Sequence, residues 1–397
     1  MLSTNKIKLK ASSISEKIIS IRRKLHKNPE LGFEEFETSS LIANFLCNLG
    51  LDVKTGVAKT GVTALLSGRK SGKTLAIRAD IDALPITELN TFEYASVNKG
   101  KMHACGHDAH ISIVLGAANI LSSLQDELAG NIRFIFQPAE EGLGGSRLMI
   151  EDGVLASPRV DAIIAAHVDP SLKTGRISVR PGPVMATPGE FEIVISGKSG
   201  HAAEPHKSIN PIITAASIVG LLKTVVKSEK DILKKAVLSV TYLHSGSSYN
   251  IIPDRAVIRG TVRTFDISLS KDISKEIESI TALKAKEAGA DYTFRYDIGY
   301  PPVVNDPEAV KALISSAGKI IPYENIITDA EPSMLAEDFA YYAQAVPGVY
   351  FRLGCSKTED ETVYNLHSSR FTIDEACIQT GIEIMSQFAV DFLNGKK

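Results

Sequence analysis

Short apolar runs alternate with amphipathic segments along the first 180 residues or so. Each run is bounded by polar turns, and its unbroken apolar character is typical of a strand buried on both faces. The runs read GVTALLSG, TLAIRAD, NIRFIFQ and DAIIAAH. Helical periodicity lies between them, over residues 108–127 and 144–155. This alternation predicts an α/β sheet covered on both faces by helices.

Two amphipathic segments precede these runs. Ser13 and Glu16 have the spacing of a capping box, which predicts a helix that begins near Ser13. The apolar side chains that would share one face of this helix are Ile14, Ile18, Ile21 and Leu25. A second helix is predicted over EEFETSSLIANFLCNLG, with Gly50 at its end.

The middle of the chain follows a different pattern. Strand-like and helix-like segments occur in the order βαββαβ, which is the ferredoxin-like order. They cover residues 189–196, 208–226, 236–243, 256–264, 269–288 and 291–297. The strand-like GVYFRLG and an amphipathic helix over 373–393 then resume the first pattern. We therefore predict a discontinuous α/β domain, residues 1–185 and 299–397, and an inserted α+β domain, residues 186–298.

Composition excludes several classes of protein. The formal net charge of the 397 residues is -2, without a long basic tract, so nucleic acid is not an expected partner. No run approaches the roughly 20 apolar residues of a membrane helix, so no membrane association is expected. The N-terminus lacks the apolar core of a signal peptide, and the four cysteines are scattered. These features predict a cytoplasmic protein with reduced thiols.

The stretch MHACGHDAHISIVLGAA concentrates side chains that bind metals. It holds three of the nine histidines and one of the four cysteines, at His103, Cys105, His107 and His110. A polar loop before a helix is the simpler interpretation. A metal site is the alternative, and it requires ligands from elsewhere in the chain.

Such ligands follow the apolar runs. Ligands in open α/β sheets gather at the carboxyl ends of the strands. Acidic or imidazole side chains end three of the predicted strands: Asp80 and Asp82, Glu140 and Glu141, and His167. With Cys105 and His107 they offer nitrogen, sulfur and oxygen donors suited to a borderline divalent cation. His367, after the last predicted strand, is a further candidate.

Five motifs carry a resemblance to a known family. HACGHD, QPAEEG, HAAEPH, YNIIPD and AEDFA occur in the order found in the metal-dependent amidohydrolase branch of the M20 peptidases, and the likeness runs from about residue 20 to about 390. This branch includes aminoacylases, hippurate hydrolases, auxin-conjugate hydrolases and thermostable carboxypeptidases. The resemblance implies a catalytic domain with two divalent metal ions and an inserted lid domain through which two subunits form a homodimer, with a higher oligomer left open.

The resemblance also implies roles for individual residues. It makes Glu140 the general base and Asp82 a residue that orients a ligand. The metal ligands would be Cys105, His107, Glu141, His167 and His367. Asp80 stands where other M20 branches have a metal-binding histidine, so the division of ligands between the two ions stays open. The mixed donor set favours zinc, and manganese, cobalt and nickel are alternatives.

In the lid, the resemblance assigns substrate contacts. Asn250 and Arg263 would engage the carboxylate of the substrate, because an arginine fork matches a carboxylate with two hydrogen bonds. A solvated charge on a strand is the alternative for Arg263. His201 would donate a hydrogen bond to the oxyanion, from the partner subunit's lid.

Other polar residues are left with two interpretations each. His103 and His110 would either support the ligands or pack as ordinary buried polar groups. Asp80 would be structural or would support a ligand. Glu337 and Asp338 would cap a helix over EDFAYYAQA or lie near the metals.

The predicted function is metal-dependent hydrolysis of the amide bond of N-acyl amino acids, by a metal-activated water with Glu140 as general base. One alternative is a carboxypeptidase that releases C-terminal amino acids from short or N-blocked peptides. The alternative from another class is a catalytically inactive, metal-stabilised dimerisation or binding protein. The presence of Glu140 argues against it, because a structural metal does not require an adjacent carboxylate that binds no metal.

Overall fold

The computed structural model describes residues 4–226, 235–357 and 364–395. The chain divides into two compact units, which we call the first and the second unit. The first comprises residues 1–182, 304–330 and 338–397, and the second comprises 183–303 and 331–337. The predicted insert, 186–298, therefore lies inside the longer segment of the second unit. The chain passes between the units four times: at β7 (Gly182–Met185), at β14 (Val303–Asn305), and before and after residues 331–337.

A mixed sheet forms the centre of the first unit. Within the described residues it has eight strands in the order β1-β2-β4-β3-β5-β16-β6-β15. Strands β4, β3, β5 and β16 are parallel neighbours, so their carboxyl ends lie along one edge. The bounds are β1 Asp52–Val57, β2 Gly61–Ser67, β3 Lys70–Asp80, β4 Ala129–Gln137, β5 Ala162–Lys173, β6 Ile177–Ser178, β15 Ile326–Ile327 and β16 Gly348–Ser356. The apolar runs of the sequence thus form buried, largely parallel strands.

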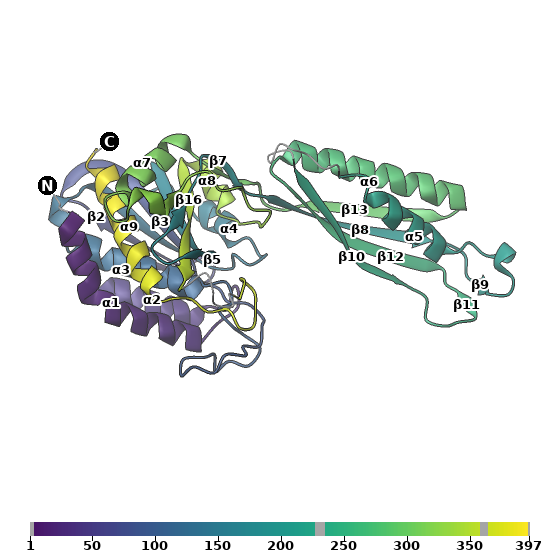
Figure 1. The fold of residues 1–397 in the computed structure, drawn as a ribbon, viewed down its shortest axis with the longest axis horizontal. Helices are drawn as coiled ribbons and strands as arrows, with labels where there is room; N and C mark the ends of the chain where they lie inside the picture. Colours follow the sequence, from purple (N-terminus) through teal and green to yellow (C-terminus); the bar gives the residue numbers. More distant parts are fainter. Residues whose placement is uncertain (1–3, 227–234, 358–363, 396–397) are drawn as a thin grey trace. The chain divides into compact units, whose positions relative to one another are not determined.

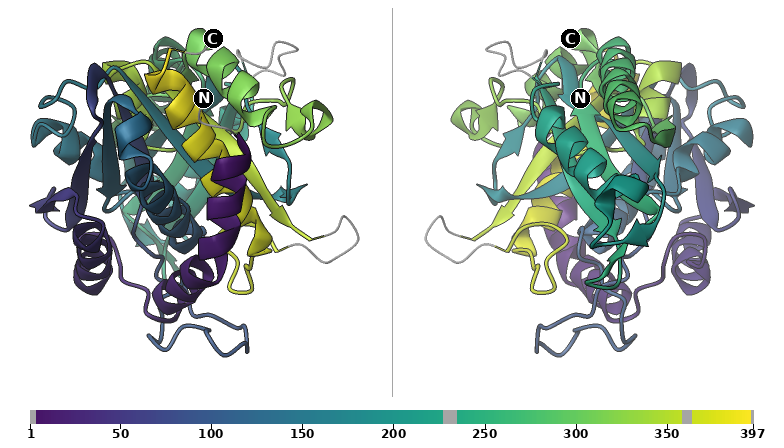
Figure 2. Two further views of the ribbon diagram at one scale, coloured as in Figure 1. Left: turned by 90° about the vertical axis from the view of Figure 1, so that its left-hand side faces the viewer. Right: turned by 90° about the vertical axis from the view of Figure 1, so that its right-hand side faces the viewer.

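Helices cover this sheet. On one side α1, α3 and α9 pack against one another, with α2 against α3 and α7 against α9. The purple α1 and the yellow α9 lie side by side in Figure 2, left. The shorter α4 and α8 contact each other, and they also contact β4 and β16, respectively. The bounds are α1 Thr4–Lys27, α2 Phe36–Asn48, α3 His107–Ser122, α4 Gly145–Glu151, α7 Pro307–Ala317, α8 Ala340–Ala345 and α9 Ala376–Leu393.

The predicted start of the first helix is wrong. Helix α1 begins at Thr4, and the Ser13 hydroxyl donates to the carbonyl of Lys10 instead of capping a helix end. Ile7 and Ala11 extend the apolar stripe toward the N-terminus, and both are fully buried. Burial of this longer stripe stabilises the additional turns, so tertiary packing outweighs the local capping signal.

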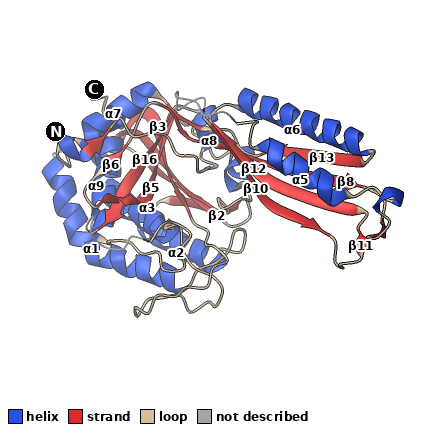
Figure 3. Ribbon diagram, turned by 45° about the vertical axis from the view of Figure 1, so that its right-hand side comes forward, coloured by secondary structure: helices blue, strands red, loops and turns tan. Residues whose placement is uncertain are grey.

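The second unit has the βαββαβ order expected from its sequence. Its sheet is antiparallel, in the order β10-β12-β8-β13. Helices α5 and α6 pack on this sheet, as Figures 1 and 3 show. The bounds are β8 Thr187–Ser196, α5 Pro211–Leu222, β10 Ala236–Ser245, β12 Arg255–Thr264, α6 Ile267–Ala288 and β13 Asp291–Ile298. A separate two-stranded ribbon pairs β9 (Gly200–His201) with β11 (Ile251–Ile252).

Candidate metal centre

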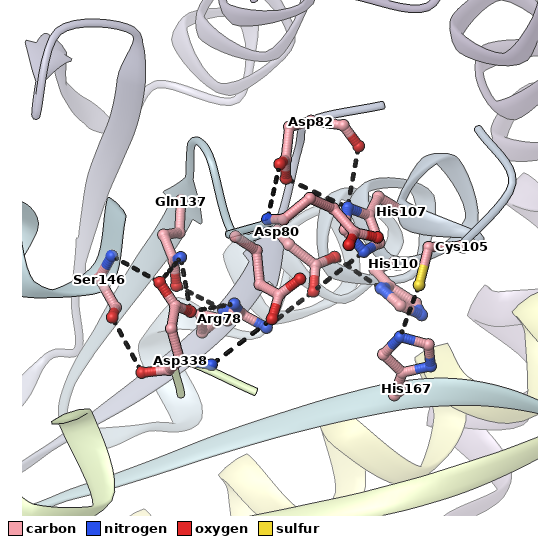
Figure 4. Close-up of polar contacts among 12 residues, drawn as sticks. Arg78, Asp80, Asp82, Cys105, His107, His110, Gln137, Ser146, His167 and Asp338 are labelled. Carbon is pink, nitrogen blue, oxygen red and sulfur yellow. Dashed lines mark hydrogen bonds and ion pairs between the residues drawn. The ribbon is translucent and has the colours of Figure 1, made fainter. Parts of the chain in front are cut away.

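Cys105 and His107 flank a glycine that turns the chain into α3. Gly106 has a φ of 86°, and a Cβ at this position would lie 2.4 Å from Cγ2 of Val168, so only glycine fits. The turn brings Sγ of Cys105 to 3.3 Å from Nε2 of His167, on β5 (Figure 4). Three potential ligands therefore meet here, because the ligand atoms of Cys105, His107 and His167 all lie within 4.8 Å of one another.

The imidazole of His107 is held by Asp82. Nδ1 of His107 lies 2.8 Å from the carbonyl oxygen of Asp82 and 3.2 Å from its Oδ1. A carbonyl oxygen only accepts, so Nδ1 carries the proton and donates. Nε2 is buried and has no hydrogen-bond partner in the described part of the chain. A buried nitrogen of this kind fits a ligand that faces a cation.

A strained residue aims both glutamates at the same region. Ala139 has a φ of 53°, in the left-handed region, and its N–H donates to Oε1 of the buried Glu35 at 2.9 Å. The N–H of Glu141 donates to Oδ2 of Asp82 at 3.0 Å. As a result, Glu140, Glu141 and His107 each place a ligand atom within 4.8 Å of the others. Successive side chains of an extended segment would point to opposite sides.

His367 approaches from a loop far along the chain. Its φ is 66°, and its N–H donates to the carbonyl of Ala104 at 2.8 Å, which ties the loop to the residue before Cys105. Nε2 of His367 lies 3.2 Å from Oε1 of Glu141. Cys105, Glu141 and His367 form another group whose ligand atoms lie within 4.8 Å of one another. The structure thus brings together all five side chains predicted to bind metal.

The metal centre is electrostatically suited to a cation. Burial raises the pKa of the Cys105 thiol, and the carboxylates of Glu141 and Glu140 raise it further. Burial also raises the pKa of Glu141, but its contact with His367 and the charge of His107 outweigh burial and lower that pKa overall. A divalent cation would favour the Cys105 thiolate that the surrounding carboxylates disfavour. The donor set of thiolate, imidazole and carboxylate fits a borderline cation such as zinc.

Before a cation binds, the two central histidines differ in protonation, and a cation at Nε2 of His107 would displace the proton there. Burial lowers the pKa of His107, but Asp80 and Asp82 raise it to about 10 overall. Burial, together with His110 and His107, lowers the pKa of His167 well below its ordinary value. His167 is therefore a neutral imidazole. Its Nδ1 lies 2.8 Å from the carbonyl oxygen of Val168 and must donate to it, so the lone pair of Nε2 points toward Cys105.

A buried polar network below the pocket was missed in the sequence. Arg78 donates to Gln137, Asp80 and Asp338 at 2.9, 2.8 and 3.2 Å. Asp338 also accepts from Gln137 and from the N–H of Ser146 (Figure 4). The available signal was Arg78 itself, a charged residue inside an apolar strand run. Glu35 gave no comparable signal, because its segment reads as an exposed helix start.

The predicted capping role of Asp338 is wrong. Helix α8 starts at Ala340, and the residue before it, Phe339, makes no side-chain capping bond. The Asp338 carboxylate instead binds the partners of the buried network, and its N–H lies 3.4 Å from Oε1 of Glu140. The fully buried Asp338 carboxylate accepts hydrogen bonds from the Arg78 guanidinium, the Gln137 amide and the N–H of Ser146. These donors satisfy it more completely than one exposed helix end would.

Two of the three predicted substrate contacts lie together in the second unit. His201 pairs with Ile251 across the β9–β11 ribbon, and the carbonyl of Asn250 accepts from the N–H of Ala202 at 3.0 Å. The N–H of Ala203 donates to Nδ1 of His201 at 3.1 Å. Neutral His201 therefore carries its proton on Nε2, and its side chain is exposed. The oxyanion role predicted for His201 requires such a donor.

Arg263 lies elsewhere in the second unit. It pairs with Pro188 at one end of the β12–β8 ladder, whereas Arg255 pairs with Ser196 at the other end, next to the β9 segment. At about 3.3 Å per residue, roughly 26 Å of strand separate Arg263 from Arg255. The half-buried Arg263 guanidinium donates to Thr261 and to the carbonyl of Val262. One copy of this unit does not bring Arg263 to His201 and Asn250.

Comparisons with known proteins agree with this geometry. Residues 76–391 match the model of peptidase family M20/M25/M40. The chain is 40% identical over 396 residues to thermostable carboxypeptidase 2 of Saccharolobus solfataricus, with 98% of each chain covered. It is 40% identical over 367 residues to N-acetyl-L-cysteine deacetylase of Bacillus subtilis, with 92% of this chain and 86% of that one covered.

A solved structure is also similar. The crystal structure of a Bacillus subtilis protein described as a dinuclear metal-binding peptidase from the M20 family matches with a TM-score of 0.83 at 36% identity, covering 96% of this chain and 99% of that one. The fold and the site define a metal-dependent hydrolase. The chain belongs to peptidase family M20/M25/M40, as its motifs indicate. No helix in the described ranges combines the length and the apolar character needed to cross a membrane.

Proposed function

We propose that this protein hydrolyses the amide bond of N-acyl amino acids. The observation that carries the proposal is the convergence of five potential ligands in overlapping groups, with the Glu140 carboxylate beside them. In this proposal the residues that hold two divalent cations are Cys105, His107, Glu141, His167 and His367. Zinc suits the donors best, with manganese, cobalt and nickel as alternatives. Bound there, the cations would polarise the amide carbonyl and acidify water.

Glu140 serves as the general base in this reaction. Its carboxylate lies within 4.8 Å of ligand atoms of Glu141 and His107, and among the described residues the groups that include it do not contain Cys105. It takes a proton from the attacking water and passes it to the leaving amine nitrogen as the C–N bond breaks. Asp82 holds Nδ1 of His107 and the N–H of Glu141, so a single carboxylate orients two ligands.

The second unit supplies the substrate contacts in this proposal. We assign it as the lid and dimerisation domain, over about residues 186–298. Nε2–H of His201 donates to the oxyanion, while Asn250 and Arg263 bind the carboxylate of the substrate. His201 and Arg263 lie near opposite ends of the sheet, and this separation along β12 supports their acting in two different active sites. His201 would act in the partner subunit's site, which makes each site composite.

Carboxypeptidase activity is the second candidate. The 40% identity to thermostable carboxypeptidase 2, over nearly the whole of both chains, favours this activity. The relative named N-acetyl-L-cysteine deacetylase favours deacylation in the same way. Both reactions cleave an amide next to a free carboxylate, so the same catalytic residues serve both. They differ in what lies on the acyl side of the bond.

A hydrolysis screen separates these candidates. Metal-supplemented protein is given N-acetyl, N-benzoyl, N-carbobenzoxy and indole-acetyl amino acids in parallel with unblocked dipeptides, and released amino acid is measured. We expect the highest kcat/KM for an N-acyl amino acid. Faster cleavage of dipeptides, or of long blocked peptides, would favour the carboxypeptidase. No hydrolysis of any of these with any of the four metals would refute the proposed function.

A further inference from the structure

His110 lies between the two central imidazoles of the metal centre. It follows His107 by three residues on α3, so both side chains lie on one face of the helix. Its ring centroid is 5.4 Å from that of His107 and 4.6 Å from that of His167. The side chain is 2% exposed and shares a possible metal group with Asp80 and His107. Position alone would therefore make it a sixth candidate ligand.

Its hydrogen bonds exclude that role. Nε2 of His110 lies 3.0 Å from the backbone nitrogen of Val168, and a backbone N–H only donates, so Nε2 holds a lone pair that is already used. Nδ1 lies 2.6 Å from Oδ1 of Asp80 and therefore carries the proton that it donates (Figure 4). Neither nitrogen of His110 is left for a cation.

Asp80 is occupied in the same way. Its second oxygen, Oδ2, accepts from Nη1 of Arg78 at 2.8 Å, and both side chains are almost completely buried. Burial would raise the pKa of Asp80, but the charges of His107 and Arg78 and the hydrogen bond from His110 keep it well below its ordinary value. Asp80 is thus a paired anion that accepts from His110, although it stands where other M20 branches have a metal-binding histidine.

Val168 connects His110 to His167. The N–H of Val168 is bound by His110, and its carbonyl accepts from Nδ1 of His167. Both groups belong to one residue of β5, so the bond to its N–H restrains the carbonyl as well. Because that carbonyl selects the Nδ1–H tautomer of His167, the position of the Val168 backbone determines which nitrogen of His167 faces Cys105.

We propose that His110 is a positioning residue of the metal centre: anchored by Asp80, it fixes the Val168 backbone and thereby the metal-binding tautomer and ring orientation of His167, without binding metal itself. This inference rests on the proposed metal-dependent function. It explains why the side chain between two ligands is itself a histidine, since this position needs a donor on one side and an acceptor on the other.

Two substitutions separate the two bonds. His110→Asn places an amide near the position of Nδ1, so it keeps the donor to Asp80 but leaves the N–H of Val168 without an acceptor. His110→Gln reaches the position of Nε2 with its amide oxygen, so it keeps the acceptor for Val168 but loses the donor to Asp80. Ser112→Ala is the matched control. It removes a buried hydroxyl from the same helix, where that hydroxyl donates locally to the carbonyl of Asp108.

The readouts go beyond activity. Zinc affinity is measured by competition with a chelator, cobalt-substituted protein is examined by visible absorption, and thermal unfolding is measured on metal-free protein. We expect His110→Asn to lose about 10- to 100-fold in zinc affinity, as is typical when the partner of a ligating histidine is removed. Its cobalt spectrum should change, while the Tm of the metal-free protein should fall only as far as one unpaired buried N–H requires. His110→Gln should lose less.

Two results would overturn the proposal. Wild-type zinc affinity and cobalt spectra in both variants would mean that His110 does not position His167. If the fall in the Tm of the metal-free protein accounted for the whole loss of zinc affinity, or if both variants failed to fold, His110 would be assigned to packing alone. If the wild-type protein bound no zinc or cobalt, the proposed function would fail instead, so the two failures are distinguishable.

Discussion

Two regions hold their polar groups in opposite ways: the metal centre of the first unit, and the part of the β9–β11 ribbon around His201 and Asn250 in the second unit, which we call the His201 corner. In the centre, Asp82 orients the buried His107, and the carbonyl of Val168 orients the half-buried His167. In the corner, His201 accepts a bond from the N–H of Ala203, two residues away, and its donor faces solvent. The first unit thus folds with its ligands already arranged. In the proposed dimer, the corner would be half of a recognition site that the partner subunit completes.

The largest expected effect comes from removing a ligand in the buried centre. Cys105→Ala and His167→Ala should each lose bound metal and reduce hydrolysis to background while leaving the far-UV circular dichroism largely unchanged, because both side chains project from elements that the core holds in place. Elemental analysis of the purified variants measures the loss. Full occupancy in both would remove these residues from the ligand set. Cys47→Ala, at an exposed cysteine on α2, is the matched control.

The next effect separates the two adjacent glutamates. Glu140→Gln should keep both ions and lose about 10²- to 10⁴-fold in kcat, because an amide cannot accept a proton from water. Glu141→Gln should lose metal affinity first, since its carboxylate is a proposed ligand. Metal titration and steady-state kinetics on both variants measure the difference. Near-normal turnover by Glu140→Gln would contradict the proposed mechanism.

A subunit-mixing experiment tests whether the His201 corner completes a second subunit's site. His201→Ala alone should lose about 10²- to 10³-fold in kcat, as for the loss of one oxyanion donor. Random mixing of equal amounts with Glu140→Gln should restore about a quarter of wild-type activity, because half of the dimers are mixed and each has one intact site. Verified subunit exchange without recovery would place His201 in its own subunit's site or deny it a catalytic role.

A smaller effect is expected at the other end of the same sheet. Arg263→Ala should weaken productive binding of an N-acyl amino acid by about 1.5–3 kcal/mol, the range for a hydrogen bond to a charged group. Amidation of the substrate carboxylate should cause a similar loss in the wild type and little further loss in the variant. Fully additive losses in this double-mutant cycle would mean that Arg263 does not bind the carboxylate.

The smallest expected effect is on the pH dependence of the free energy of unfolding, and it comes from the buried His26 of α1. His26 lies between Asp108 and Glu88, with Nδ1–Oδ2 and Nε2–Oε1 distances of 2.8 and 3.1 Å. Burial lowers the pKa of His26, but the attraction of Asp108, even against the repulsion of Arg22, raises it overall. The folded state therefore binds this proton more tightly than the unfolded state does. The resulting stability is complete below about pH 6.5 and is lost as pH rises through the folded pKa.

Denaturant unfolding of metal-free protein between pH 6 and 9 tests this expectation. The free energy of unfolding of the wild type should fall as pH rises through that window, and His26→Gln should remove this part of the slope. His206→Gln, at an exposed histidine of the second unit, is the matched control. An identical slope in the wild type and His26→Gln would show that His26 does not gain a proton on folding.

Part of the centre could be predicted because parallel strands end at one edge. Asp82 and Glu141 follow the neighbouring strands β3 and β4, and His167 ends the predicted apolar run of β5, although β5 itself continues to Lys173. Their proximity therefore required only the order of the apolar runs. The place of His367 after the last predicted strand made it a further candidate, and the family resemblance assigned it as a ligand, because its loop lies 194 residues beyond the end of β5. The network around Arg78 and Asp338 could not be derived, because contacts between segments this far apart depend on how the helices and the sheet pack.

The middle position of β16 in the first sheet has a consequence for synthesis of the protein on the ribosome. This strand lies between β5 and β6 but is among the last elements translated, and α9, which packs on α3, follows it. The first unit therefore cannot close its sheet, or receive His367, until translation is nearly finished, whereas nearly all of the second unit is a continuous segment that can fold earlier. Metal insertion would then be a late event. Proteolysis of arrested nascent chains ending near residue 345 should find residues 183–303 protected and the first unit still sensitive.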